Sequence, residues 1–141
     1  MNIVMRMVFV LGIAALCLAA GCRTHEHHSR APVPSWIDYP KTSDSVFMYV
    51  IGAAADQPSG AIAREEAYKD ALRQISRRIL TEAGLGIDVL PADGVLTPLE
   101  GAEVMPDCTY IQPDGWSFAA WVQVSFPIAE KRKVVEELRG R

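Results

Sequence analysis

The chain has 141 residues, of which 50% are hydrophobic and 22% are charged, and its formal net charge is -3. This length supplies one folded domain at most, because a second core would need more residues. Proteins that track a nucleic-acid backbone concentrate an excess of Lys and Arg, so the weak negative charge excludes that class and no nucleic-acid partner is expected.

Residues 1–21 are predicted to be a secretory signal. Met7–Leu18 is an apolar run that is too short to cross a bilayer as a helix. Small residues follow it and end at Gly21 and Cys22. This stretch resembles the bacterial lipoprotein signal, which implies cleavage between Gly21 and Cys22 and lipidation of Cys22. The alternative is a plain secretory peptide cut after Ala20, which would leave Cys22 as an ordinary thiol or disulfide partner.

The lipoprotein resemblance implies a membrane partner and a location. Acyl chains on Cys22 would bury methylene groups at about 0.8 kcal/mol each, which anchors a protein without spanning the bilayer. Arg23 follows the cysteine where an aspartate would imply retention at the inner membrane. In a two-membraned bacterium, the resemblance therefore implies the cell envelope, with a lipid anchor in the outer membrane.

Residues 22–45 are predicted to be the lipidated cysteine and a flexible tether, because prolines and serines are frequent and no apolar period is present. All histidines of the chain lie here, at His25, His27 and His28. Imidazoles bind zinc, copper or nickel, but this spacing in a tether fixes no geometry, so they are only weak metal candidates. Without a histidine in the remaining chain, Ser-His-Asp and Cys-His catalysis is not expected.

Residues 46–141 are predicted to form the folded domain. Val46–Gly52 is rich in β-branched and aromatic residues and predicts a buried strand. A helix is expected over 60–83, with Asp56 or Ser59 as its cap and an apolar face at three- and four-residue steps. A short strand could follow at 87–90. The isolated glycines around Gly86 do not make a phosphate loop, and no cofactor is expected.

The outer face of the 60–83 helix carries charged side chains. Glu65 and Lys69 are spaced to pair at i, i+4. Arg73 and Arg77 belong to an ordinary solvated face, or alternatively to a docking site for an acidic partner or a lipid headgroup. They are therefore candidate partner contacts.

The clearest local signal is a β-hairpin. Strands are expected over 108–112 and 116–126, joined by Pro113–Gly115. Alternation places Trp116 on the core face and Trp121 on the opposite face. Trp121 and Trp36 are candidate partner contacts if exposed, but we expect the Trp36 segment to cover Trp121. A helix is predicted over 128–138, after Pro127.

These elements predict an α+β domain: a small antiparallel or mixed sheet of three to four strands with two helices packed on one face. The pattern resembles the small bacterial outer-membrane lipoproteins of the LPP-twenty type, whose domain is similar to the N-terminal domain of flagellar assembly protein T. The resemblance spans about residues 34–139 and implies no catalytic residues. It rests on five segments: Pro34–Ile37, Tyr49–Gly52, the helix with Ala67 and Ala71, Asp114–Gly115, and Trp121–Val124.

The function expected from these observations is non-enzymatic presentation of the domain to an envelope protein partner. One alternative is a carboxylate-based hydrolase of cell-wall glycan, which needs two facing acids across a cleft. Another is a metal-binding lipoprotein that uses the histidines of the tether. Cys108 is expected to be buried as a small apolar residue; the alternative is a thiol that is reactive or pairs with another molecule. The candidate acids for the hydrolase are Asp88, Asp93, Glu100, Glu103 and Asp107.

Overall fold

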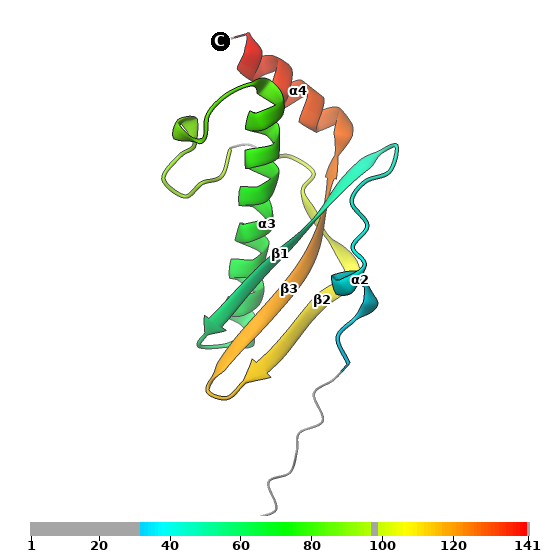
Figure 1. Ribbon diagram of the computed structural model, residues 1–141, viewed down its shortest axis with the longest axis vertical. Helices are drawn as coiled ribbons and strands as arrows, with labels where there is room; N and C mark the ends of the chain where they lie inside the picture. Colours follow the sequence, from blue (N-terminus) through cyan, green and yellow to red (C-terminus); the bar gives the residue numbers. More distant parts are fainter. Residues whose placement is uncertain (1–31, 97–98, 141) are drawn as a thin grey trace, which may run out of the picture. The chain divides into compact units, whose positions relative to one another are not determined.

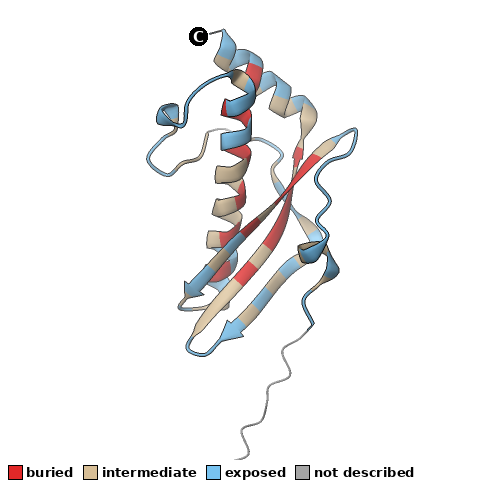
Figure 2. Cartoon of the chain, viewed as in Figure 1, coloured by how far each residue is buried: buried red, intermediate tan, exposed pale blue. Residues whose placement is uncertain are grey.

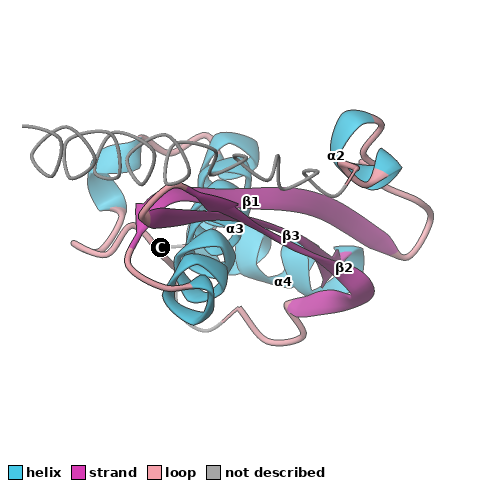
Figure 3. Cartoon of the chain, turned by 90° about the horizontal axis from the view of Figure 1, so that it is seen from below, coloured by secondary structure: helices cyan, strands magenta, loops and turns pink. Residues whose placement is uncertain are grey.

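The computed structural model describes residues 32–96 and 99–140 (Figure 1). Three antiparallel strands form one sheet in the order β1-β3-β2, and helices pack against it, which confirms the predicted α+β class. In the view of Figure 3, α2 and α4 lie on opposite sides of the strand layer. The elements in chain order are α2 (Ser35–Asp38), β1 (Phe47–Gln57), α3 (Gly60–Ala83), the 3-10 helix η1 (Ile87–Val89), β2 (Glu103–Asp114), β3 (Ser117–Pro127) and α4 (Ile128–Arg139).

Helix α3 has the predicted bounds because both of its ends carry local signals. The Ser59 hydroxyl accepts a hydrogen bond from the backbone N–H of Ile62 at 3.2 Å, so Ser59 rather than Asp56 is the N-cap. Gly84 ends the helix with a φ of 77°, the left-handed conformation that glycine adopts without strain. On the outer face, Lys69 pairs with Glu65 at 2.8 Å as predicted.

The first half of α3 lies very close to β1. Ala63, Ala67 and Ala71 form a fully buried stripe of small side chains on the helix. Gly52 of β1 faces this stripe, and a Cβ atom at Gly52 would lie 1.9 Å from the Ala67 carbonyl oxygen. Small residues on both elements therefore set the distance between helix and sheet.

The second half of α3 packs over larger side chains. Figure 2 shows buried residues along α3 and along the central strand β3. Helix α4 closes this end of the core with Val135, and Lys131 pairs with Glu82 of α3 at 2.6 Å. The large buried side chains here are Ile75, Ile79, Leu80, Val122, Val124 and Phe126.

The segment between α3 and β2 runs along the helix rather than forming a strand. The predicted strand at 87–90 is wrong: Leu90 N donates to Ile87 O at 3.1 Å, which closes the 3-10 turn η1, and no neighbouring strand pairs with it. Three side chains of α3 hold the segment, each through one hydrogen bond to its backbone. They are Tyr68 OH to Ala102 O at 3.0 Å, Arg73 Nε to Asp93 O at 3.0 Å, and Ser76 Oγ from Leu96 N at 2.9 Å.

The hairpin differs from its prediction in register and length. Asp114 pairs with Ser117, so Gly115 and Trp116 are the two central residues of the turn. Gly115 has a φ of 62°, as the first position of a type II′ turn requires. The prediction that Trp116 lies on the core face is therefore wrong, and its side chain is fully exposed. Strand β2 also begins at Glu103 instead of 108, with an irregular register between Val104 and Thr109.

The folded domain begins before residue 46. Within the segment predicted as tether, Ser35–Asp38 forms α2 and Ser43 makes a β-bridge with Met48. The backbone N–H of Tyr49 donates to Thr42 O at 2.9 Å. These contacts use backbone groups, which a polar composition does not reveal, and they extend the domain toward its N-terminal side.

Candidate functional site

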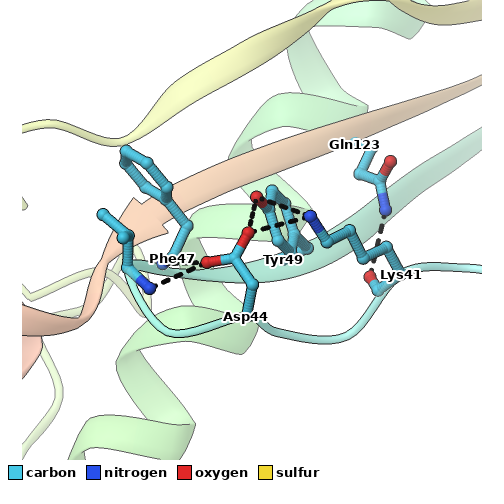
Figure 4. A network of polar contacts seen from close by, with 6 residues as sticks. Lys41, Asp44, Phe47, Tyr49 and Gln123 are labelled. Carbon is cyan, nitrogen blue, oxygen red and sulfur yellow. Dashed lines mark hydrogen bonds and ion pairs between the residues drawn. The ribbon is translucent and has the colours of Figure 1, made fainter.

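A polar cluster fastens the segment before β1 to the open face of the sheet (Figure 4). Val50 and Val124 point into the core, so Tyr49 and Gln123, which neighbour them along the strands, point to the opposite face. Gln123 Nε2 donates to Lys41 O at 3.1 Å. The Tyr49 hydroxyl donates to Asp44 Oδ2 at 2.6 Å, and Lys41 Nζ lies 2.8 Å from the same oxygen.

The carboxylate of Asp44 is the centre of this cluster. Its other oxygen accepts the backbone N–H groups of Val46 and Phe47, both at 2.8 Å. Hydrogen bonds from Lys41, then from Tyr49 and these two N–H groups, hold the pKa of Asp44 well below its usual value of 3.8. All of these donors come from residues 41–49 of the protein itself, so the carboxylate is already satisfied and the cluster is not an empty binding site. We call this cluster the clasp, because it holds residues 41–49 together.

We expect the pKa of Asp44 to rise toward its usual value in the Lys41→Met variant, because the largest cause of its depression is removed. Because the pKa of Asp44 is depressed in the folded protein, its carboxylate stabilises the clasp fully at pH values above the usual pKa. This contribution is lost as the pH falls through the pKa of the folded state. A ¹³C NMR titration of the Asp44 carboxyl group in both proteins measures the shift. Identical midpoints would contradict the role given to Lys41.

The outer edge of β1 is covered by groups of the chain itself. Thr42 O accepts the Tyr49 N–H, as described above. Gln74 Nε2 donates to Ile51 O at 2.8 Å, and Asp70 Oδ2 accepts the Ala53 N–H at 3.1 Å. Side chains from α3 thus occupy backbone groups that a further strand would need.

The outer edge of β2 is open in comparison. The pair Asp114 and Ser117 flanks a two-residue turn, so alternate residues of β2 bond to β3 and the others point outward. The outward residues are Thr109, Ile111 and Pro113. No hydrogen bond within residues 32–96 and 99–140 reaches the N–H of Thr109 or Ile111. Pro113 has no N–H, which suits an edge strand.

The four predicted partner contacts do not form one surface. Arg73 donates to the Asp93 carbonyl and supports the fold, whereas Arg77 is exposed on α3. Trp36 on α2 is half-buried. Trp121 is half-buried on the open face of the sheet, where its ring centroid lies 5.7 Å from that of Tyr110.

Two exposed apolar groups were not identified from the sequence. One is Trp116 at the hairpin turn. The other comprises Leu85, Ile87 and Val89, which follow α3 at the opposite end of this helix. Amphipathic periodicity could not find them, because both lie in turns where neighbouring side chains have no fixed face.

The candidate acids of the hydrolase hypothesis are all exposed and lie on η1, in the following segment and on β2. Among the residues that the structure describes, no group of three His, Cys, Asp or Glu side chains is arranged to hold a metal ion. No helix in this part of the chain is long and apolar enough to cross a membrane. Gly21, Cys22, His25, His27 and His28 lie outside the described residues.

Cys108 is half-buried on β2, and burial followed by the neighbouring Asp107 charge raises the pKa of its thiol above the usual 9.0. We therefore expect slower alkylation by iodoacetamide at a pH of about 8 than for a cysteine in a short peptide, because the thiolate is the nucleophile. Asp107→Asn should accelerate the reaction partly, since burial remains. Asp107 has a φ of 59°, which asparagine also tolerates. A native rate equal to that of the peptide would contradict this expectation.

No protein family, curated protein or solved structure matches this chain.

Proposed function

We propose that this protein is a lipid-anchored envelope lipoprotein whose α+β domain binds a protein partner and performs no catalysis. The anchor is Cys22, in the motif Leu18–Cys22. The outer membrane is the location that the residue after Cys22 favours.

The observation that carries the binding function is the contrast between the two edges of the sheet. The chain covers β1 with Thr42, Asp70 and Gln74, yet leaves Thr109 and Ile111 of β2 uncovered. An extended segment of a partner can pair with such an edge and gain main-chain hydrogen bonds. The partner is thus expected to contribute one strand, and its side chains would lie beside Ile111 on one face and Tyr110 on the other.

The anchor is tested by metabolic labelling with a fatty acid and membrane fractionation of wild type and Cys22→Ser. We expect label and membrane association in wild type and the loss of both in the variant. Equal labelling of the two proteins would overturn the lipid anchor.

The binding edge is tested with Thr109→Pro. Thr109 is exposed and its N–H points outward, so proline removes a donor needed by an added strand without removing a bond to β3. A photo-crosslinking residue at position 111 should capture a discrete envelope protein, and Thr109→Pro should abolish this capture. Far-ultraviolet circular dichroism establishes that the variant remains folded.

The matched control places the crosslinker at Arg77, which is also exposed and lies on α3. Capture of the same partner from position 77 but not from position 111 would show that the partner binds α3 instead of the edge of β2. Capture that persists in folded Thr109→Pro would exclude strand addition.

A further inference from the structure

The side chain of Trp116 is not packed against any other part of the described domain. It occupies the second central position of the hairpin turn and its relative exposure is 102%. A tight turn holds its backbone in place, so the indole projects from the tip of the hairpin. Indoles prefer the boundary between the polar headgroups and the acyl chains of a bilayer, because one part of the ring is apolar and its N–H is polar.

The described chain begins at the same end of the domain as this turn. Figure 1 shows the first described residues, near Pro32, at the lower end, together with the β2–β3 turn and the start of α3. We call this the hairpin end; it comprises Gly115, Trp116 and the beginning of α3 at Gly60. A Cβ atom at Gly60 would lie 3.1 Å from Ile111 of the hairpin, so helix and hairpin meet here.

The length of chain before Pro32 limits how far this end can lie from a lipid on Cys22. Position 32 lies ten residues after position 22 in the sequence, and ten steps along the chain span at most about 36 Å when fully extended. Helix α3 has 24 residues, which corresponds to a length of about 36 Å. The other apolar group, around Ile87, lies beside the last turns of α3 (Figure 1). It would therefore require most of this extension to reach the same lipid surface.

We infer that the hairpin end faces the bilayer and that Trp116 enters the interfacial region of its zwitterionic lipids. This inference rests on the proposed anchor at Cys22 and adds an orientation and a second membrane contact to it. Asp56 and Asp114 are exposed acids at the same end and offset the exposed cation Arg64 near the start of α3, so attraction to anionic headgroups is not the cause of the contact. The contact is apolar and should be insensitive to salt.

The test uses the lipidated mature protein in phosphatidylcholine vesicles with and without bromine on the upper part of the acyl chains. Bromine quenches tryptophan fluorescence only at short range. The chain has three tryptophans, and the other two are half-buried in the domain. We expect brominated lipid to reduce the emission by up to about one third, the share of one tryptophan among three, at both low and high salt.

Trp116→Phe should remove this quenching, and its full exposure means that the substitution leaves the core intact. The matched control is Ile87→Ser, which changes an exposed apolar residue at the far end and should leave the quenching unchanged. Quenching that persists in Trp116→Phe, or an absence of quenching in wild type, would overturn the inference.

Flotation of the vesicles and the mass of the N-terminal peptide, measured on the same samples, separate the two proposals. If the protein carries lipid and floats but Trp116 is not quenched, the anchor stands and the orientation is wrong. If no lipid is attached, the anchor fails and the orientation that rests on it fails too.

Discussion

Gly52→Ala is expected to destabilise the protein strongly, although it adds a single methyl group. The new Cβ would lie 1.9 Å from the Ala67 carbonyl oxygen and 2.6 Å from the Ala71 nitrogen. Both are backbone atoms of α3, so no side-chain rotation relieves the clash and the helix must move away from the sheet. We expect a loss of about 3 kcal/mol or more in the free energy of unfolding, against a total of about 5–15 kcal/mol for a typical domain.

Urea unfolding followed by circular dichroism measures this loss, and Gly140→Ala is the matched control. Gly140 lies at the end of α4 with a φ of -83°, and an added Cβ would meet its nearest atom at 3.5 Å. The control should change stability by no more than about 0.5 kcal/mol. A Gly52→Ala variant within about 1 kcal/mol of wild type would show that α3 packs farther from β1 than described here.

Phe126→Ala should have the second large effect. Phe126 is the largest fully buried side chain of the described domain and pairs with Met48 across the sheet. It lies in the cluster that includes Val135 of α4. Removing a buried aromatic side chain costs about 3–5 kcal/mol through lost burial and the cavity that remains. The same urea unfolding experiment measures the change.

Two comparison variants test whether the loss of stability arises from the buried position of Phe126. Phe126→Leu conserves most of the volume and should lose less than about 1.5 kcal/mol. Phe47→Ala removes the same atoms from a half-buried position on the opposite face of the sheet and should cost less than Phe126→Ala. Equal losses at positions 47 and 126 would contradict the described core.

The elements that were predicted well carry their signals locally. Helix α3 has a capping serine at Ser59, a stop at Gly84 and an uninterrupted apolar face between them. Helix α4 was likewise expected after Pro127. Short-range hydrogen bonds and periodic burial determine both helices, so the sequence alone contains what is needed to place them.

The elements that were missed depend on contacts between distant parts of the chain. The turn lies one residue beyond its expected place, which moved Trp116 from the core to solvent, because the register with β3 selects Gly115 for the first turn position. The segment around Lys41 is ordered by bonds to Tyr49 and Gln123. Neither the turn register nor these hydrogen bonds produce a periodic pattern in the sequence.

The candidate interface at the edge of β2 could not be predicted from the sequence either. Its recognition needs the strand order, which makes β1 and β2 the two edges of the sheet. It further needs the knowledge that Asp70 and Gln74 cover one edge. The partner contacts expected from the sequence are aromatic and cationic side chains, whereas the open edge consists of backbone groups.

The strand order has a consequence for how this chain can fold as it emerges N-terminus first. Strand β3 is the central strand, but it follows β1 by about sixty residues of intervening chain, from Gln57 to Ser117. Neither β1 nor β2 has a pairing partner until β3 is available. Helix α3 is therefore synthesised before the sheet on which it packs can form. The sheet can assemble only after residues 117–127 have emerged, and the earlier segments must remain soluble or be held by a chaperone until then.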